Sequence, residues 1–143
     1  MKNLLFLICA MTLLVVGSKT YGQGNENSSN TQTDRKASVK NIDANEAEKL
    51  LQENKKVVVL DVRTPKEFTA GHIAGATNIN FYDADFEKKL IALDKARPYL
   101  VHCAVGGRSA KARELMKTLQ FKSIYHLEGG LKAWEKAGKP VER

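Results

Sequence analysis

The chain has 143 residues and a formal net charge of +7 at pH 7, and 27% of its residues are charged. The basic excess is spread along the chain without interleaved aromatic residues, so we expect no nucleic-acid partner. His72, His102 and His126 are scattered and lack the spacing of metal ligands, so we expect neither a metal nor a cofactor.

The first 22 residues predict a secretory signal peptide. Lys2 provides the basic start, residues 4–16 are apolar apart from Thr12, and Thr20-Tyr21-Gly22 offers the small residues that precede a cleavage site. The apolar run is shorter than a membrane span, which needs about 20 residues, so a cleaved signal is favoured over an uncleaved membrane anchor. We therefore expect a periplasmic or secreted protein, without membrane association once the signal is removed.

Cleavage would change both the charge and the thiol content of the chain. It would remove two lysines, lowering the net charge from +7 to +5, and it would remove Cys9, leaving Cys103 as the single cysteine. One cysteine cannot form an internal disulfide framework, so a thiol kept outside the cytoplasm indicates a chemical role. Residues 23–37 are polar and predict a disordered linker. Residues 38–143 form the predicted domain.

The predicted domain alternates short apolar strands with helices. Residues 57–60 form a continuous apolar run, which is typical of strands buried on both faces of a parallel sheet. Asp43 and the capping box from Thr64 to Glu67 mark two helix starts. The alternation predicts a doubly wound α/β domain with a mostly parallel sheet, whose ligands bind at the carboxyl ends of the strands. Strands are expected at residues 39–42, 57–60, 76–79, 99–101 and 123–127, and helices at 44–53, 65–70, 83–93, 110–119 and 131–136.

A thiol lies between the strand at residues 99–101 and the following helix. Gly106 and Gly107 allow a tight bend in which successive N–H groups point inward and form an anion-binding nest. The helix N-terminus adds positive potential, Arg108 adds a permanent charge, and Ser109 is expected to cap the helix. Such surroundings lower a thiol pKa from about 8.5 to roughly 3.5–7.5, so Cys103 is predicted to be a nucleophile. The candidate site is Cys103-Ala104-Val105-Gly106-Gly107-Arg108-Ser109.

Two charged residues close the strand that precedes the thiol-bearing strand in the sequence. Asp61 and Arg63 are candidates for supporting residues, because the end of their strand could approach the site. A structural role is the favoured interpretation of both. Arg63 is expected to pair with Glu67, which lies four residues later.

Three stretches of the chain resemble the signature sequences of rhodanese domains. They occur in the order that the family shows and cover nearly all of residues 38–143. The resemblance implies a rhodanese-like α/β domain with a five-stranded, mostly parallel sheet flanked by helices. The stretches run from Asp61 to Ile79, from Cys103 to Ser109, and over Leu127-Glu128-Gly129-Gly130-Leu131-Lys132-Ala133-Trp134.

The resemblance also implies a sulfurtransferase that carries sulfane sulfur as a persulfide of Cys103. The donor would be a small sulfur-containing anion such as thiosulfate, or a persulfide. The acceptor would be cyanide in an assay and a thiol or a protein in the cell. The chemistry predicted for the loop agrees, because its N–H groups would hold the outer sulfur. Arg108 would bind the donor anion and stabilise the thiolate, and Ser109 would donate to the sulfur.

Three other functions remain open on the sequence. A non-catalytic binding module of this fold would need neither Cys103 nor Arg108, and both are present. A phosphatase loop has five residues between cysteine and arginine, whereas four separate Cys103 from Arg108 here, which suits one sulfur atom better than a tetrahedral phosphate. A thiol redox protein would need a resolving cysteine, and the other cysteine, Cys9, lies in the predicted signal.

Overall fold

The computed structural model describes residues 37–143. The predicted signal peptide at residues 1–22, and the predicted linker up to residue 36, lie outside the described residues. Within the described part, no helix combines the length and the apolar character needed to cross a membrane.

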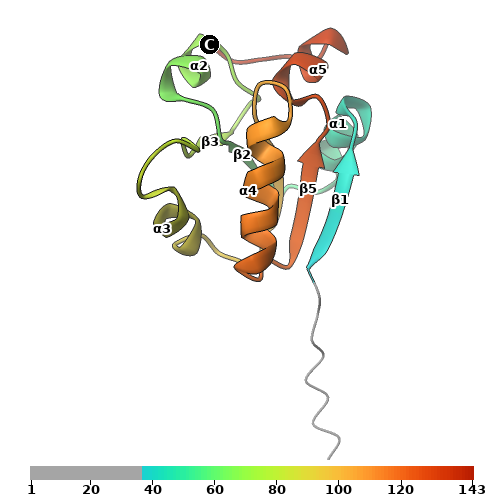
Figure 1. The fold of residues 1–143 in the computed structure, drawn as a ribbon. Coiled ribbons are helices and arrows are strands. Elements are labelled where there is room, and N and C mark those ends of the chain that lie inside the picture. The colour runs from blue at the N-terminus through green and yellow to red at the C-terminus, as the bar shows by residue number, and fades with distance from the viewer. Residues whose placement is uncertain (1–36) are drawn as a thin grey trace, which may run out of the picture. The chain divides into compact units, whose positions relative to one another are not determined.

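Five parallel strands of the described part form one sheet in the order β1-β5-β4-β2-β3. The central strand β4 pairs with β5 on one side and with β2 on the other, so Tyr99 lies opposite both Ile124 and Val58. Figure 1 shows this sheet behind a long helix. The strands are β1 Ser38–Ile42, β2 Val58–Asp61, β3 Thr77–Asn78, β4 Pro98–His102 and β5 Ser123–Leu127.

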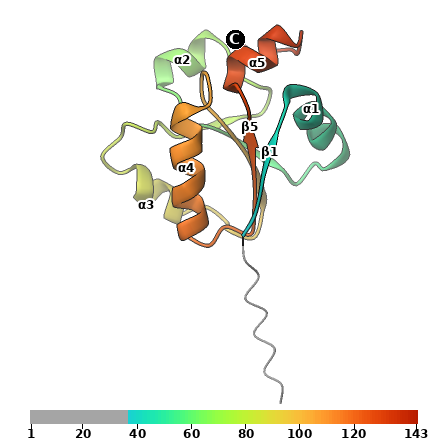
Figure 2. The same cartoon turned by 45° about the vertical axis from the view of Figure 1, so that its right-hand side comes forward.

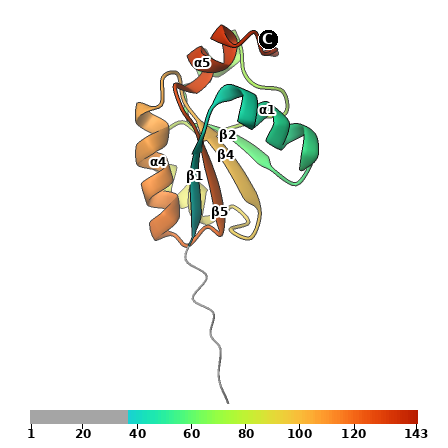
Figure 3. The same ribbon diagram turned by 90° about the vertical axis from the view of Figure 1, so that its right-hand side faces the viewer.

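Helices cover both faces of the sheet. They are α1 Ala44–Glu53, α2 Pro65–Ala70, α3 Phe86–Ile91, α4 Gly107–Thr118 and α5 Gly130–Lys136. The core residues of α3 and α4 pack on one face, and those of α1 and α5 pack on the other. Figure 3 shows the sheet edge-on between α4 and α1. In Figure 2, α2 lies with α5 at the carboxyl end of the strands. The arrangement confirms the predicted doubly wound α/β domain with a five-stranded parallel sheet.

Two helix starts that the sequence predicts are fixed by capping boxes. The Asp43 carboxylate accepts hydrogen bonds from the backbone N–H groups of Asn45 and Glu46, at 2.8 and 2.9 Å. Glu46 returns the contact by accepting from the Asp43 N–H at 2.9 Å. Thr64 and Glu67 form the same reciprocal pair at the start of α2. Because the partners lie three residues apart, local sequence alone determines where these helices begin.

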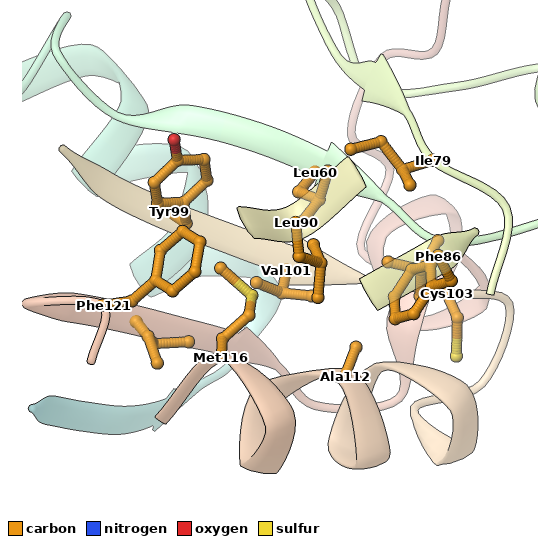
Figure 4. Close-up of a cluster of buried hydrophobic side chains, with 12 residues drawn as sticks. Leu60, Ile79, Phe86, Leu90, Tyr99, Val101, Cys103, Ala112, Met116 and Phe121 are labelled. Atoms are coloured by element: carbon orange, nitrogen blue, oxygen red, sulfur yellow. The ribbon is translucent and has the colours of Figure 1, made fainter. Parts of the chain in front are cut away.

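Side chains alternate between the two faces along the central strand. Tyr99, Val101 and Cys103 belong to the cluster under α3 and α4, whereas Leu100 belongs to the cluster under α1 and α5. This is the two-residue period of an extended strand. Figure 4 shows the first cluster, with Cys103 at one end and Tyr99 and Phe121 at the other. The thiol therefore belongs to the α4 face of the sheet.

Two helices differ from the sequence prediction by more than one residue. The expected helix at residues 83–93 shortens to α3, Phe86–Ile91, because the preceding residues form a turn held by side chains. Asn80 donates to the Asp83 carboxylate at 2.6 Å and accepts from the Tyr82 N–H at 3.2 Å. In contrast, α4 begins at Gly107, three residues before the expected position.

Candidate active site

Cys103 is the first residue after β4, at the carboxyl end of the central strand. It is a free cysteine and only 1% exposed. The chain bends over residues 104–106 and enters α4 at Gly107. The candidate site therefore lies where the predicted topology places a ligand of a doubly wound sheet.

The bend depends on one of the two glycines, not on both. Gly106 has a left-handed backbone with φ of +100° and is the N-cap residue of α4. Gly107 has no positive φ and is the first residue of the helix. The Gly106 N–H donates to the Cys103 Sγ at 3.1 Å, and the left-handed backbone of Gly106 turns the chain from the loop into α4.

Ser109 is not the helix cap that the sequence predicts. It lies in the first turn of α4, where its side chain is fully buried. Its Oγ is 3.4 Å from the Cys103 Sγ and 3.0 Å from the carbonyl oxygen of Gly106. The predicted contact between Ser109 and the sulfur is present, whereas the cap position belongs to Gly106 because the glycine begins the helix earlier.

The thiol is surrounded by donors that favour its ionised form. Burial raises the pKa of Cys103, but hydrogen bonds from the Ser109 hydroxyl and from the backbone N–H groups of Ser109, Val105 and Gly106 lower it. The donors outweigh burial, and the pKa of the thiol falls below its ordinary value. A lowered pKa gives more thiolate at neutral pH, which is the nucleophilic form of cysteine.

Arg108 forms a two-pronged ion pair with Glu67 of α2. Its guanidinium donates to the two carboxylate oxygens at 2.8 and 2.7 Å. This pairing lowers the pKa of Glu67 to about 2 and raises that of Arg108. The prediction that Glu67 pairs with Arg63 is wrong, because α2 turns Glu67 toward the loop. Arg108 also lies over the ring of Tyr82, 5.6 Å from its centroid.

Asp61 and Arg63 form a buried ion pair on the other face of the sheet. The guanidinium donates to the Asp61 carboxylate at 2.6–2.9 Å and to the carbonyl oxygen of Gly71 at 2.7 Å. Asp61 lies opposite His102 in the sheet register, so the strand period separates both from the next residue, Cys103. The structure does not bring Asp61 or Arg63 to the sulfur. Instead, this ion pair connects the end of β2 to the end of α2.

Three residues that the sequence analysis did not assign to the site hold the loop from behind. The N–H groups of Leu131 and Lys132 donate to the carbonyl oxygens of Cys103 and Ala104, at 2.8 and 3.0 Å. Gly130 permits this close approach, because a Cβ there would lie 2.4 Å from the Cys103 carbonyl oxygen. The Gly129-Gly130 pair was the available signal, since paired glycines before a helix indicate a close backbone contact.

A separate cavity of about 420 Å³ opens on the face of the sheet that carries α1. Apolar side chains including Leu51, Ile73 and Trp134 line it, and none of the loop residues does.

Within residues 37–143, no three His, Cys, Asp or Glu side chains come together as a metal site would require. The candidate site is thus defined by the donors around one sulfur atom.

Comparison with known proteins identifies the family. Residues 43–137 match the model of the rhodanese-like domain. The chain therefore belongs to the rhodanese-like domain family, as its three signature stretches predicted.

Individual relatives agree with the family match. Rhodanese-like domain-containing protein 14, chloroplastic, of Arabidopsis thaliana is 30% identical, over 73% of this chain and 65% of its own length. The chain thus spans less than two thirds of that relative. Thiosulfate sulfurtransferase GlpE of Pseudomonas putida is 36% identical, over 64% of this chain and 81% of its own length. The crystal structure of a rhodanese-related protein from Thermoplasma volcanium is similar, with a TM-score of 0.65 and 35% identity over 72% of this chain and 97% of that one.

The contact between α5 and the loop predicts a large effect for Gly130→Ala and a small one for Gly138→Ala. Both glycines have left-handed backbones, with φ of +60° and +72°, but a Cβ at Gly138 meets nothing within 4 Å. Gly138→Ala should lower the free energy of unfolding by about 1–2 kcal/mol. Gly130→Ala should lower it by about 2–5 kcal/mol, since overpacking adds to the backbone strain.

Urea unfolding measures both losses, and the rate of Cys103 alkylation by iodoacetamide reports on the loop. Alkylation should slow at neutral pH in Gly130→Ala and stay unchanged in Gly138→Ala. Equal losses of stability in the two variants would mean that Gly130 does not pack closely against the backbone of the loop.

Proposed function

We propose that the protein is a sulfurtransferase that moves sulfane sulfur through a persulfide of Cys103. The observation that carries the proposal is the buried thiol whose pKa is lowered by donors from the loop and from Ser109. Relatives named thiosulfate sulfurtransferase support the assignment, since they align over more than half of the chain. The donor is a small sulfur-containing anion such as thiosulfate, or a persulfide.

The reaction has two half-reactions, and each transfers one sulfur atom. In the first, the Cys103 thiolate attacks the outer sulfur of thiosulfate. The bond between the two sulfur atoms of thiosulfate breaks, and sulfite leaves with the electron pair. In the second, cyanide or a thiol acceptor attacks the outer sulfur of the persulfide and releases the Cys103 thiolate. This is covalent catalysis of the ping-pong kind, in which the thiolate form of Cys103, favoured by the lowered pKa, attacks without a general base.

The loop contributes mainly through its backbone. N–H groups that converge on the sulfur stabilise a negative charge there, whether it resides on the thiolate or on the persulfide. Ser109 adds a hydroxyl donor from the first turn of α4. Neither the attack nor the release requires a proton to be moved by a side chain. The chemistry therefore depends on how precisely the loop is held.

The thiol chemistry predicts a stable sulfur adduct. Protein treated with thiosulfate, with no acceptor present, should gain the mass of one sulfur atom on Cys103, and cyanide should remove it as thiocyanate. Cys103→Ser should neither gain the mass nor produce thiocyanate, because a serine hydroxyl is not ionised at neutral pH. Intact-mass spectrometry and a thiocyanate assay measure the two results.

Two outcomes would contradict the proposal. Thiocyanate production by Cys103→Ser would show that the thiol is not the sulfur carrier. Turnover of p-nitrophenyl phosphate by the native protein, without any sulfur adduct, would favour a phosphatase.

The Glu67–Arg108 pair predicts opposite effects for two charge variants. Glu67→Gln retains a side chain suited to the capping box of α2 but leaves the Arg108 charge uncompensated. It should raise kcat/KM for thiosulfate, a dianion, by about three- to tenfold, corresponding to the ~1 kcal/mol of a partly exposed charge. Arg108→Ala leaves the Glu67 carboxylate uncompensated and should lower kcat/KM by a similar factor.

A sulfane-sulfur donor that carries no charge at neutral pH is the control for both variants. Its kcat/KM should change little, since a charge near the loop acts weakly on a neutral molecule. Loss of activity with both donors in Arg108→Ala would mean that the ion pair maintains the shape of the loop and does not act through its charge.

We also propose that the protein is exported. The support is the sequence at the N-terminus, where Lys2 and the apolar run at residues 4–16 have the pattern of a secretory signal. N-terminal sequencing of protein from cells that express the full chain should find a start near Gln23, in the periplasm or the medium. A cytoplasmic protein that retains Met1 would contradict the proposal.

A further inference from the structure

We propose that His126 is a positioning residue that aims the Ser109 hydroxyl at the sulfur of Cys103. His126 lies on β5, beside β4 in the sheet register, and is 6% exposed. Its Nε2 is 2.9 Å from the Ser109 Oγ, which is in turn 3.4 Å from the Cys103 Sγ. The Ser109 hydroxyl therefore contacts both the imidazole and the sulfur.

The direction of these hydrogen bonds follows from counting protons. The Ser109 hydroxyl has a single proton, and three acceptors compete for it: the sulfur, the carbonyl oxygen of Gly106 and an unprotonated His126 Nε2. The Nε2 is also 3.3 Å from the Gly106 carbonyl oxygen, which can only accept. A single proton on Nε2 can be shared between the Ser109 Oγ and the Gly106 carbonyl oxygen as a three-centre hydrogen bond, whereas a lone pair there would face the lone pairs of the carbonyl.

The Gly106 carbonyl oxygen then has two N–H donors. It accepts from the Ala110 N–H at 2.9 Å, in the first turn of α4, and from the His126 Nε2–H at 3.3 Å. The Ser109 Oγ is also 3.0 Å from this oxygen, but the two N–H groups compete with the serine proton for its two lone pairs. With Nε2 protonated as well, the sulfur is the favoured acceptor of the Ser109 proton.

The other ring nitrogen supports the same proton placement. His126 Nδ1 is buried and has no hydrogen-bond partner among the described residues. A second proton on the ring would leave a buried N–H without an acceptor, which is more costly than a buried lone pair. The pKa of His126 lies below its ordinary value. Burial lowers it most, the contact with Gly106 raises it, Arg113 lowers it and Glu128 raises it. The ring is therefore neutral at neutral pH, with its one proton on Nε2.

This inference rests on the proposed function, because a donor aimed at sulfur serves sulfur transfer, but it concerns the thiol alone and is tested without a transfer reaction. The rate of Cys103 alkylation by iodoacetamide, measured against pH, gives the thiol pKa. His126→Leu removes the donor at nearly constant volume and should raise the pKa of Cys103 by about half a unit to one unit. His126→Gln places an amide N–H near the Nε2 position and should restore most of the shift.

Ser109→Ala provides the decisive comparison. On its own it should raise the pKa of Cys103 at least as much as His126→Leu does. In the double variant, the two shifts should not add, because His126 acts through Ser109. Additive shifts would overturn the proposal, since they would mean that His126 acts on the sulfur independently. An unchanged pKa in His126→Leu would overturn it as well.

Urea unfolding of each variant verifies that the fold is intact. If His126→Leu does not fold, His126→Asn replaces it, since the shorter amide cannot reach the Ser109 hydroxyl and should show the same rise in pKa. Equal thiol pKa values in His126→Asn and His126→Gln would contradict the proposal. Absence of thiocyanate production by the native protein would remove the proposed function and leave these pKa results unaffected.

Discussion

The geometry of the thiol depends on two hydrogen bonds made behind it. The first turn of α5 donates to the carbonyl oxygens of Cys103 and Ala104. Because a trans peptide unit is planar, its N–H points opposite to its C=O. Fixing these two carbonyls toward α5 therefore turns the N–H groups of Ala104 and Val105 the other way, into the bend that surrounds the sulfur. The Val105 N–H contributes to the lowered pKa of Cys103. Its orientation depends on α5, which lies on the opposite side of the loop.

Charge and hydrogen bonding act on the site through different elements. The donors around the sulfur come from the loop and the first turn of α4, and they carry no net charge. The formal charges come from Arg108 and Glu67, which face each other from α4 and α2 and largely cancel. The site can therefore stabilise a thiolate without presenting a strongly positive entrance. The Glu67 carboxylate also accepts hydrogen bonds from Thr64 in the capping box of α2. The same carboxylate therefore stabilises the start of its own helix.

The elements of the fold could be predicted from the sequence because their signals are local. Asp43, Thr64 and the apolar runs of the strands act through neighbours a few residues away. The site was predicted only as far as the strand-loop-helix pattern reaches: Cys103 at a strand end, and donors in the loop. The partners of Arg63 and Glu67 were not predicted correctly. Arg63 lies before α2 and turns back to Asp61 at the end of β2, and α2 turns Glu67 toward Arg108 of α4. No local pattern records that rotation.

The start of α4 was also not predicted correctly from local sequence. Serine is a good capping residue, and Ser109 was the natural candidate. The structure gives that position to Gly106, whose left-handed backbone starts the helix earlier and carries Ser109 inward. There it meets His126, which is distant in sequence and adjacent only because β5 lies beside β4. Sequence reasoning had weighed the three histidines only as metal ligands.

The division between backbone and side chains in the loop has a consequence for partner choice. The reactivity of the sulfur is set by groups that lie behind it, whereas the Val105 side chain is 64% exposed and Gly107 has open space around its Cα. These outward positions contribute no side chain to the sulfur. In the proposed sulfur transfer they would form the surface that an acceptor meets first, so substitutions there would change which acceptor is recognised while the thiolate keeps its environment. Acceptor specificity and thiol reactivity would then be able to diverge within a loop of seven residues, Cys103-Ala104-Val105-Gly106-Gly107-Arg108-Ser109.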